Sequence, residues 1–334
     1  MKKSQIEKYI GNQAQIGGSR HYELTDGWGR NLRAIDVNSG AGLHYTILPD
    51  RGMDISLASF KGTNLVYMTC NGETHPSFYE SDNFGWLHTF GGGLLTTCGL
   101  THLGPPCIDE GENLGLHGRY STIPAKQVAD LSEWLGDEFH IKIRGVVEDA
   151  SMFGNKLRLV REISTVQGSN SIKICDTITN FGSMPSPYCI LYHFNLGYPL
   201  LSEDAELEIE PKKTTAGNPQ ATNNIAHFKH FSVPQAGFEE QLFHHQLASD
   251  YFGYAEVKLK NIALGMALTM RIKTAQLPFL TQWKMLGEGE YVLGLEPCNV
   301  TMKNRKTLRD ENILPLLQAG ESVTNCLEIL LQVI

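Results

Sequence analysis

Two side chains that can exchange protons lie inside apolar runs of this sequence. His193 belongs to the run 189–196, which is apolar except for His193 and Asn195, and Glu296 follows the apolar run 291–295. Histidine titrates near neutral pH, and burial would raise the pKa of a carboxylate and make it a stronger base once ionised. The sequence therefore offers a candidate acid and a candidate base. The aromatic and amide side chains beside His193 suggest that a sugar fills the pocket, so we expect the reactive atoms to lie in one cleft, spaced to flank a sugar ring.

The neighbours of the two residues favour a pocket. Asn195 is two positions beyond His193, so both side chains share one face of a strand. A hydrogen-bonded core histidine is the commoner explanation of an isolated His, but the break at 197–199 just beyond favours a pocket rim. Pro297 cannot donate to a strand ladder, so we expect the strand to end there or to lie at a sheet edge. A structural salt bridge is the alternative role for Glu296.

Three more residues are candidate ligand-binding groups. His117 lies next to Gly118, where the backbone can turn sharply and leave room for a ligand, although an exposed polar loop fits this segment equally well. Arg51 and Arg119 can each donate paired hydrogen bonds to sugar hydroxyls or to an anionic group. For Arg119, pairing with a protein carboxylate is the favoured role, because the chain is acidic.

Composition restricts the class of protein. The chain has 334 residues and no Pro- or Ser-rich linker, so we expect a single domain spanning 1–334. A formal net charge of -8 without a basic patch argues against nucleic acid as a partner. No apolar stretch suits a membrane span or a secretory signal, and the seven scattered cysteines are expected to be free thiols. These features predict a soluble cytoplasmic protein with no membrane partner.

Cofactor motifs are also missing from the sequence. Cys98, His102 and Cys107 do not have the spacing of a zinc site, and Gly91-Gly92-Gly93 does not fit a dinucleotide or phosphate-binding loop. We therefore expect neither a metal nor a nucleotide cofactor.

Short alternating runs dominate the rest of the chain. Residues 139–147 alternate apolar and polar side chains, and 157–166 and 171–179 flank a turn-forming cluster, which predicts a hairpin. Further strands are expected at 44–48, 55–60, 205–210, 255–260 and 266–272. Helical signal is confined to a short helix within 234–249, because glycines interrupt the apolar stretch 78–98. The pattern predicts an all-β fold, a large antiparallel sandwich with little helix.

Around Arg51, His117, His193 and Glu296 the sequence resembles the galactose mutarotase-like, or aldose 1-epimerase, superfamily, and most closely an uncharacterised bacterial branch of it. The resemblance runs roughly from Tyr45 to the C-terminus. It implies a β-supersandwich with a sugar cleft, His193 as general acid, Glu296 as general base and His117 as a substrate-binding histidine. The segments that carry it are Arg51-Gly52-Met53-Asp54-Ile55, Gly91-Gly92-Gly93-Leu94, Thr97-Cys98-Gly99-Leu100, Leu116-His117-Gly118-Arg119, 192–200 and Gly294-Leu295-Glu296-Pro297.

The resemblance implies an enzyme that interconverts the anomers of an aldose without a cofactor. Ionised Glu296 would then keep His193 protonated near neutral pH. Two departures concern the substrate: Arg119 stands where typical members have a glycine, and the aspartate that holds sugar hydroxyls has no match. Two alternatives remain open, namely a non-catalytic carbohydrate-binding protein and an isomerase or lyase acting on an acidic sugar, which Arg51 and Arg119 would suit.

Overall fold

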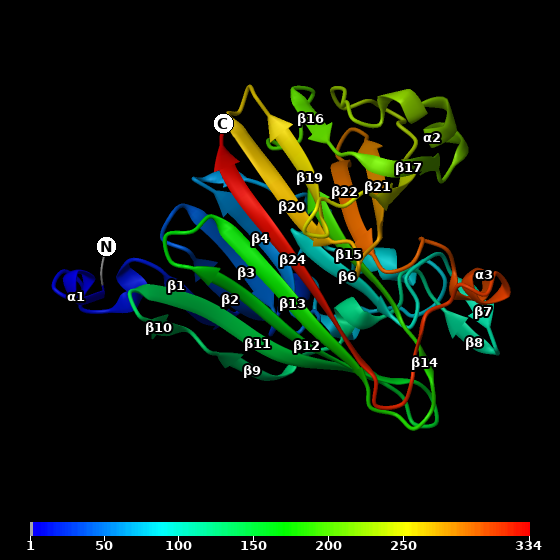
Figure 1. The fold of residues 1–334 in the computed structure, drawn as a ribbon, viewed down its shortest axis with the longest axis horizontal. Helices are drawn as coiled ribbons and strands as arrows, with labels where there is room; N and C mark the ends of the chain where they lie inside the picture. Colours follow the sequence, from blue (N-terminus) through cyan, green and yellow to red (C-terminus); the bar gives the residue numbers. More distant parts are fainter. Residues whose placement is uncertain (1–2) are drawn as a thin grey trace.

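Two large antiparallel sheets pack face to face in the computed structural model, which describes residues 3–334 (Figure 1). Sheet one has 11 strands. In order across this sheet they are β1 (Gly18–Glu23), β2 (Arg33–Asn38), β3 (Leu43–Leu48), β4 (Asp54–Phe60), β6 (Leu95–Leu100), β15 (Cys189–Leu196), β22 (Tyr291–Cys298), β21 (Phe279–Leu286), β18 (Gln241–Leu247) and β17 (Pro211–Ala216), with β5 (Thr63–Asn64) paired to β4.

Sheet two has nine strands, and two short two-stranded sheets lie outside both large sheets. In order its strands are β10 (Glu133–Leu135), β11 (Glu138–Ala150), β12 (Lys156–Val166), β13 (Ser171–Asn180), β24 (Ser322–Val333), β20 (Met266–Lys273), β19 (Tyr254–Asn261) and β16 (Ala205–Glu208), with β9 (Lys126–Asp130) paired to β11. The short pairs are β7 (Cys107–Asp109) with β8 (Glu112–Leu114), and β14 (Ser186–Pro187) with β23 (Leu316–Leu317).

The helices are all short, so the predicted all-β class with little helix is confirmed. None of the helices in the described part of the chain is long and apolar enough to cross a membrane. The α-helices are α1 (Lys3–Ile6), α2 (Pro219–Asn223) and α3 (Arg305–Asp310), and the 3-10 turns are η1 (Gln13–Gln15), η2 (Gly27–Gly29), η3 (Pro76–Phe78), η4 (Gly85–His88), η5 (Tyr120–Thr122) and η6 (Ile225–His227).

The strands expected from alternation are confirmed, and the expected helix is wrong. β12 and β13 form the predicted hairpin, in register from Leu157↔Asn180 to Ser164↔Lys173. Within 234–249 the chain forms β18 rather than a helix, because Gln241, Phe243 and the next alternate residues are buried while those between them are more exposed. This period of two suits a strand, and β18 is paired on both sides, by β17 and β21.

Both faces of β15 are covered, which explains its nearly continuous apolar sequence. Tyr192 and Phe194 point into the main core between the two sheets. Cys189 and Leu191 point to the outer face of sheet one, where they join a second core cluster that includes Trp86 of η4. His193 shares this outer face by the alternation of the strand.

One pair of cysteines is bonded, which corrects the expectation of free thiols. Cys175 on β13 and Cys326 on β24 are direct partners in the strand register, with 4.3 Å between their Cα atoms, and they form a disulfide. The other five cysteines are free. The predicted cytoplasmic localisation drew on seven free thiols, of which five remain, and it stays a prediction.

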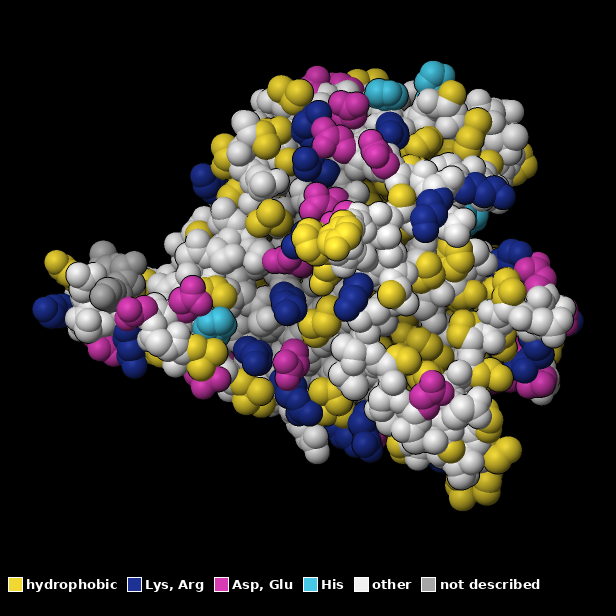
Figure 2. All heavy atoms as spheres, in the orientation of Figure 1, with side chains coloured by type: hydrophobic (Ala, Val, Ile, Leu, Met, Phe, Trp, Pro, Cys, Tyr) yellow, Lys and Arg dark blue, Asp and Glu magenta, His cyan; other side chains and the backbone are white. Residues whose placement is uncertain are grey.

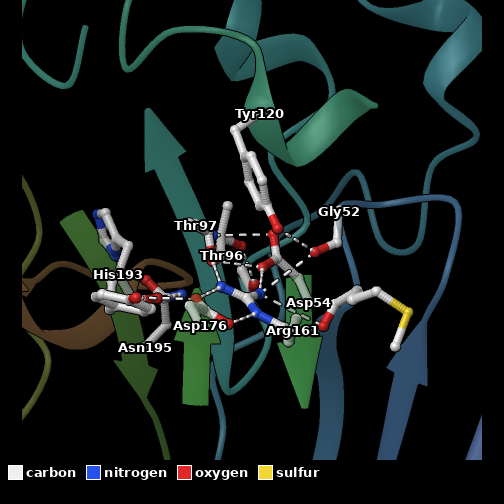
Figure 3. Close-up of polar contacts among 12 residues, drawn as sticks. Gly52, Asp54, Thr96, Thr97, Tyr120, Arg161, Asp176, His193 and Asn195 are labelled. Atoms are coloured by element: carbon white, nitrogen blue, oxygen red, sulfur yellow. Dashed lines mark hydrogen bonds and ion pairs between the residues drawn. The ribbon is translucent and has the colours of Figure 1, made fainter. Parts of the chain in front are cut away.

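A buried guanidinium joins the two sheets. Arg161 on β12 is fully buried and donates to both carboxylate oxygens of Asp176, at 2.9 and 2.7 Å. From the opposite sheet, Asp54 on β4 accepts from Arg161 at 2.8 Å, and Tyr192 on β15 donates its hydroxyl to Asp176 at 2.8 Å. Figure 3 shows Arg161 between these acceptors, with His193 beside them on its own strand.

The outer face of sheet two carries charges of both signs in alternation. Ion pairs link neighbouring strands there, such as Lys260 with Glu208 at 2.6 Å and Arg271 with Glu256 at 3.2 Å. Figure 2 shows basic and acidic side chains interspersed over this side of the molecule. Salt bridges of this exposed kind contribute little to stability, whereas removal of one partner from a buried cluster such as that of Arg161 is strongly destabilising.

We expect the substitution Asp176→Ala to lower the free energy of unfolding by about 3–5 kcal/mol, because it leaves a buried guanidinium with one carboxylate instead of two. Urea unfolding followed by circular dichroism measures the loss. Glu311→Ala is the control: Glu311 pairs with Lys303 at the surface, and its removal should change stability far less. Equal losses for the two variants would mean that the Arg161 cluster does not hold the sheets together.

Candidate active site

A cavity of about 340 Å³ lies on the outer face of sheet one and contains His193 and Glu296. These two side chains are only 4% and 1% exposed. The other lining residues are Phe84, Trp86, Leu87, Phe90, Pro105, Leu116, His117, Glu240, Leu242, Trp283 and Met302. Among the residues proposed from the sequence, the structure thus brings together His193, Glu296 and His117.

The strand that carries Glu296 ends one residue beyond Pro297, close to the expected end, but the alternative of an edge position is wrong. β22 continues to Cys298 and lies between β15 and β21, in the middle of sheet one. Its pairing with β15 is interrupted: Phe194 faces Leu295 and Leu191 faces Cys298, with no paired residues between them. Proline has no N–H to donate, so the ladder is open there, next to the two ionisable side chains.

Glu296 and His193 are in direct contact across this gap. The Nε2 atom of His193 is 3.2 Å from Oε1 of Glu296, so the two reactive groups do not flank a space the width of a sugar ring as expected. Gly294, two residues before Glu296 on the same face, leaves room for the carboxylate: a Cβ there would be 2.6 Å from Oε1. Nδ1 of His193 and Oε2 of Glu296 are buried without a hydrogen-bond partner.

Burial opposes charge on both members of this pair. It lowers the pKa of His193 to about 3, with a further lowering by His117. Burial also raises the pKa of Glu296 well above its ordinary value of 4.5, and Glu240 adds to the shift. Burial therefore opposes the expected ionised pair, in which Glu296 keeps His193 protonated, and favours a neutral His193 beside a protonated Glu296.

His117 is held in one orientation by a strained turn. Its φ is +60°, and the following Gly118 packs so closely that a Cβ would be 2.6 Å from the carbonyl oxygen of Gly99. The backbone N–H of Gly99 donates to the carbonyl of His117 at 3.0 Å, which anchors the turn on β6. The predicted sharp turn is thus confirmed, and its reason is close packing against a strand.

The tautomer of His117 follows from its contact with a carbonyl. Nδ1 is 2.8 Å from the carbonyl oxygen of Leu103, so Nδ1 carries the hydrogen and donates it. Desolvation lowers the pKa of His117 to about 4, which keeps the ring neutral at neutral pH. Nε2 therefore holds a lone pair and can accept a hydrogen bond from a ligand hydroxyl.

Aromatic rings enclose the histidines. His193 has Phe90 at 5.5 Å, Trp283 at 5.6 Å and His117 at 5.8 Å between ring centroids. Trp86 stacks on Phe90 at 4.4 Å and meets His117 edge-on at 4.8 Å. This shell supplies the low-dielectric surroundings that shift the pKa values and presents flat apolar faces to a ligand.

The remaining predicted ligand-binding residues do not line this cavity. Arg119 pairs with Asp149 at 2.7 Å, which is the structural role that the sequence favoured for it. Arg51 donates to the carbonyl of Thr89 at 2.9 Å and lines a separate cavity of about 30 Å³.

Asn195 is occupied by the backbone as well. Its Nδ2 donates to the carbonyls of Gly93 and His193, at 3.1 and 3.0 Å. The bond to Gly93 holds β15 against the glycine-rich segment before β6, so Asn195 positions the strand that carries His193. The expectation that Arg51, Arg119 and Asn195 contact the ligand of the His193 site has no support in this geometry.

Sequence reasoning missed four residues of the site: Trp86, Phe90, Trp283 and Glu240. Trp86 and Phe90 lie in the stretch 78–98. The sequence shows that this stretch is apolar, but it does not show which face of the fold the stretch covers. Trp283 is the register partner of Gly294, so only the pairing of β21 with β22 identifies it. Glu240 accepts a hydrogen bond from the Trp283 indole at 2.9 Å and has no motif around it in the sequence.

Residues 3–334 contain no group of three His, Cys, Asp or Glu side chains arranged to hold a metal ion. The candidate site combines a buried His-Glu pair, a neutral histidine acceptor and an aromatic wall, which together can move protons on a small uncharged ligand.

Comparison with known proteins places the chain in a family and identifies its fold. Residues 29–331 match the family described as "Domain of unknown function (DUF4432)". A protein of Klebsiella pneumoniae described as a "putative aldose 1-epimerase" has 25% identity and a TM-score of 0.89, over 98% of this chain and 89% of that chain. No curated protein sequence matches the chain.

Two more distant structures have the same fold. A galactose mutarotase-like protein of Clostridium acetobutylicum has 13% identity and a TM-score of 0.65, over 96% of this chain and all (100%) of that chain. A galactose 1-epimerase of Lactobacillus acidophilus has 12% identity and a TM-score of 0.59, over 95% of this chain and 99% of that chain. The fold is galactose mutarotase-like, as the sequence resemblance implied.

The raised pKa of Glu296 predicts how stability depends on pH. Above its ordinary pKa of 4.5, an unfolded Glu296 releases its proton while the folded one keeps it, so folding loses stability as pH rises toward the folded pKa. The variant Glu296→Gln has no such proton. We expect its stability relative to wild type to increase by about 1.4 kcal/mol for each pH unit in this window.

Urea unfolding of both proteins from pH 4.5 to pH 8 measures this difference. Glu311→Gln makes the same chemical change at an exposed position and should follow the wild-type curve. Parallel curves for wild type and Glu296→Gln would show that Glu296 is ionised in the folded protein.

Proposed function

Because the chain belongs to the DUF4432 family, whose description names no activity, we propose its function from the site: an aldose 1-epimerase-like enzyme that interconverts the anomers of a sugar by general acid and base catalysis. The observation that carries the proposal is the His193–Glu296 pair, buried in a cavity and joined by a 3.2 Å contact. The 25% identical aldose 1-epimerase-like structure from Klebsiella pneumoniae supports it.

Interconversion of anomers requires two proton transfers, one at each of the two oxygens bonded to C1. The base removes the proton of the C1 hydroxyl while the acid protonates the ring oxygen, so the bond from C1 to the ring oxygen breaks and C1 becomes a carbonyl. Rotation about the C1–C2 bond exposes the other face of the carbonyl. The same two transfers in reverse close the ring, and the enzyme recovers its original protons.

A His193–Glu296 pair that shares one exchangeable proton suits these steps of ring opening and ring closure. Both oxygens that exchange protons are bonded to C1, so an acid and a base in mutual contact can serve them without flanking the whole ring. Each transfer by a positioned side chain contributes about 10² to 10⁴ in rate. Ring opening leaves the pair with the proton on the other partner, which is the state that ring closure needs.

We assign His193 as the acid and Glu296 as the base, as the resemblance implies. Burial by itself favours the proton on Glu296. The assignment therefore requires this proton to move to Nε2 of His193 along the 3.2 Å contact when the sugar binds. A sugar hydroxyl that donates to Oε2 of Glu296 would drive the transfer, because it stabilises the carboxylate.

His117 completes the proposed site by holding the sugar. Its unprotonated Nε2 can accept a hydrogen bond from a hydroxyl, and the 5.8 Å between the ring centroids of His117 and His193 would allow that hydroxyl to lie near the reacting carbon. A fixed hydroxyl positions C1 against the pair, which is the orientation effect that such catalysis depends on.

We expect Glu296→Gln to lower kcat by at least about 100-fold and to leave sugar binding nearly unchanged, because the amide keeps the shape of the side chain but cannot take up the proton. His193→Asn should lower kcat to a similar extent. Polarimetry or exchange NMR over a panel of aldoses measures the rate, and calorimetry measures binding.

Glu311→Gln, the same change at the protein surface, is the control and should retain wild-type kcat. Full activity in Glu296→Gln would place the base elsewhere. A wild-type protein that binds sugars and exchanges none of their anomers would favour the non-catalytic carbohydrate-binding alternative.

A further inference from the structure

We infer that the cavity selects a neutral sugar with an apolar region away from its anomeric carbon, such as a deoxysugar, and excludes anionic sugars. This inference rests on the proposed function, because it takes His193 and Glu296 as the groups that face C1. It goes further by naming the chemical class of the substrate from the walls of the cavity.

The residues that line the cavity include no lysine or arginine. Its two acidic side chains are Glu240 and Glu296, and burial raises the pKa of Glu296. Burial also disfavours a positive charge on His117 and His193, since it lowers the pKa of each to about 4 and about 3. A carboxylated or phosphorylated sugar would find no cation there and would meet the exposed carboxylate of Glu240.

The two arginines that would have suited an acidic sugar are engaged elsewhere. Arg119 is held by Asp149, and Arg51 does not line the cavity. The alternative of an isomerase or lyase acting on an acidic sugar thus lacks the cation that it requires.

The polar groups of the cavity are few and mostly accept hydrogen bonds. With the His193–Glu296 pair occupied at C1, His117 and Glu240 remain, and Oε2 of Glu240 already accepts from the Trp283 indole at 2.9 Å. The rest of the wall is apolar: Phe84, Trp86, Leu87, Phe90, Pro105, Leu116, Leu242 and Met302.

A fully hydroxylated hexose does not suit such a wall. Each of its hydroxyls that is buried without a partner weakens binding by about 10- to 100-fold. A methyl or methylene group in place of such a hydroxyl packs against the aromatic faces of Trp86 and Phe90 without that loss. Phe84 and Leu87, 58% and 48% exposed, extend the apolar surface to the mouth of the cavity.

The size of the cavity agrees with a single sugar ring. Its volume of about 340 Å³ is near the lower limit of the range for small-molecule sites in proteins. The cavity therefore discriminates between sugars by the substituents of one ring, and the presence or absence of a single hydroxyl changes the affinity.

Matched sugars test the inference directly. In each of the galactose and glucose series, the parent hexose, its 6-deoxy form and its uronate differ only at C6. Calorimetry with Glu296→Gln, which slows turnover, gives their dissociation constants. We expect the 6-deoxy sugar to bind at least about 10-fold more tightly than the parent in at least one series, and the uronates to bind in neither.

Two variants examine the cause. Leu242→Asn places a donor and an acceptor on the wall and should reduce the preference for the 6-deoxy sugar. Glu240→Gln removes the charge at the cavity and should improve uronate binding more than neutral-sugar binding. Uronate binding equal to that of the deoxysugar, parent hexoses preferred in both series, or no binding by any sugar would overturn the inference.

Anomer exchange on the same panel separates this inference from the proposed reaction. If wild type binds the sugars in the expected order but exchanges none of their anomers, the substrate class stands and the reaction fails. If it exchanges the anomers of uronates fastest, the reaction stands and the substrate class is overturned.

Discussion

The buried guanidinium of Arg161 constrains the arrangement of the whole molecule. A fully buried positive charge is tolerated only when carboxylates surround it, and here Asp176 comes from the same sheet and Asp54 from the opposite one. Tyr192 bonds to the same cluster from β15. Because side chains alternate along a strand, fixing Tyr192 inside the sandwich fixes His193 on its outer face. The main core and the proposed active site thus lie against opposite faces of β15.

Burial of ionisable groups has different consequences on the two faces of β15. Inside the sandwich, burial is compensated by opposite charges and complete hydrogen bonding around Arg161. On the outer face, His193 and Glu296 have only each other, and each retains one polar atom without a partner. Burial there opposes charge on both groups, since it raises the pKa of Glu296 and lowers that of His193. An uncompensated polar pair in a cavity is a feature of catalytic sites more than of structural ones.

The sequence was informative wherever a local pattern decides the structure. Alternation predicted β11 and the hairpin of β12 with β13, and the apolar setting of His193 and Glu296 identified the central pair. Features that depend on pairing between distant strands were out of reach. Pro297 indicated either the end of a strand or a strand at the edge of a sheet. The strand does end one residue later, but it lies in the middle of its sheet, where a local opening of the ladder accommodates the proline. Arg51 and Arg119 had the right chemistry for a ligand, yet neither lines the cavity.

The central claim is that the His193–Glu296 pair acts on the two oxygens bonded to C1 of a sugar. A crystal structure of the Glu296→Gln variant with a bound aldose tests it most directly, since slow turnover preserves the bound anomer. The account predicts the C1 hydroxyl and the ring oxygen within hydrogen-bonding distance of His193 and of the side chain at position 296. A sugar bound in this cavity with C1 turned toward the solvent, or bound only elsewhere on the protein, would contradict the account.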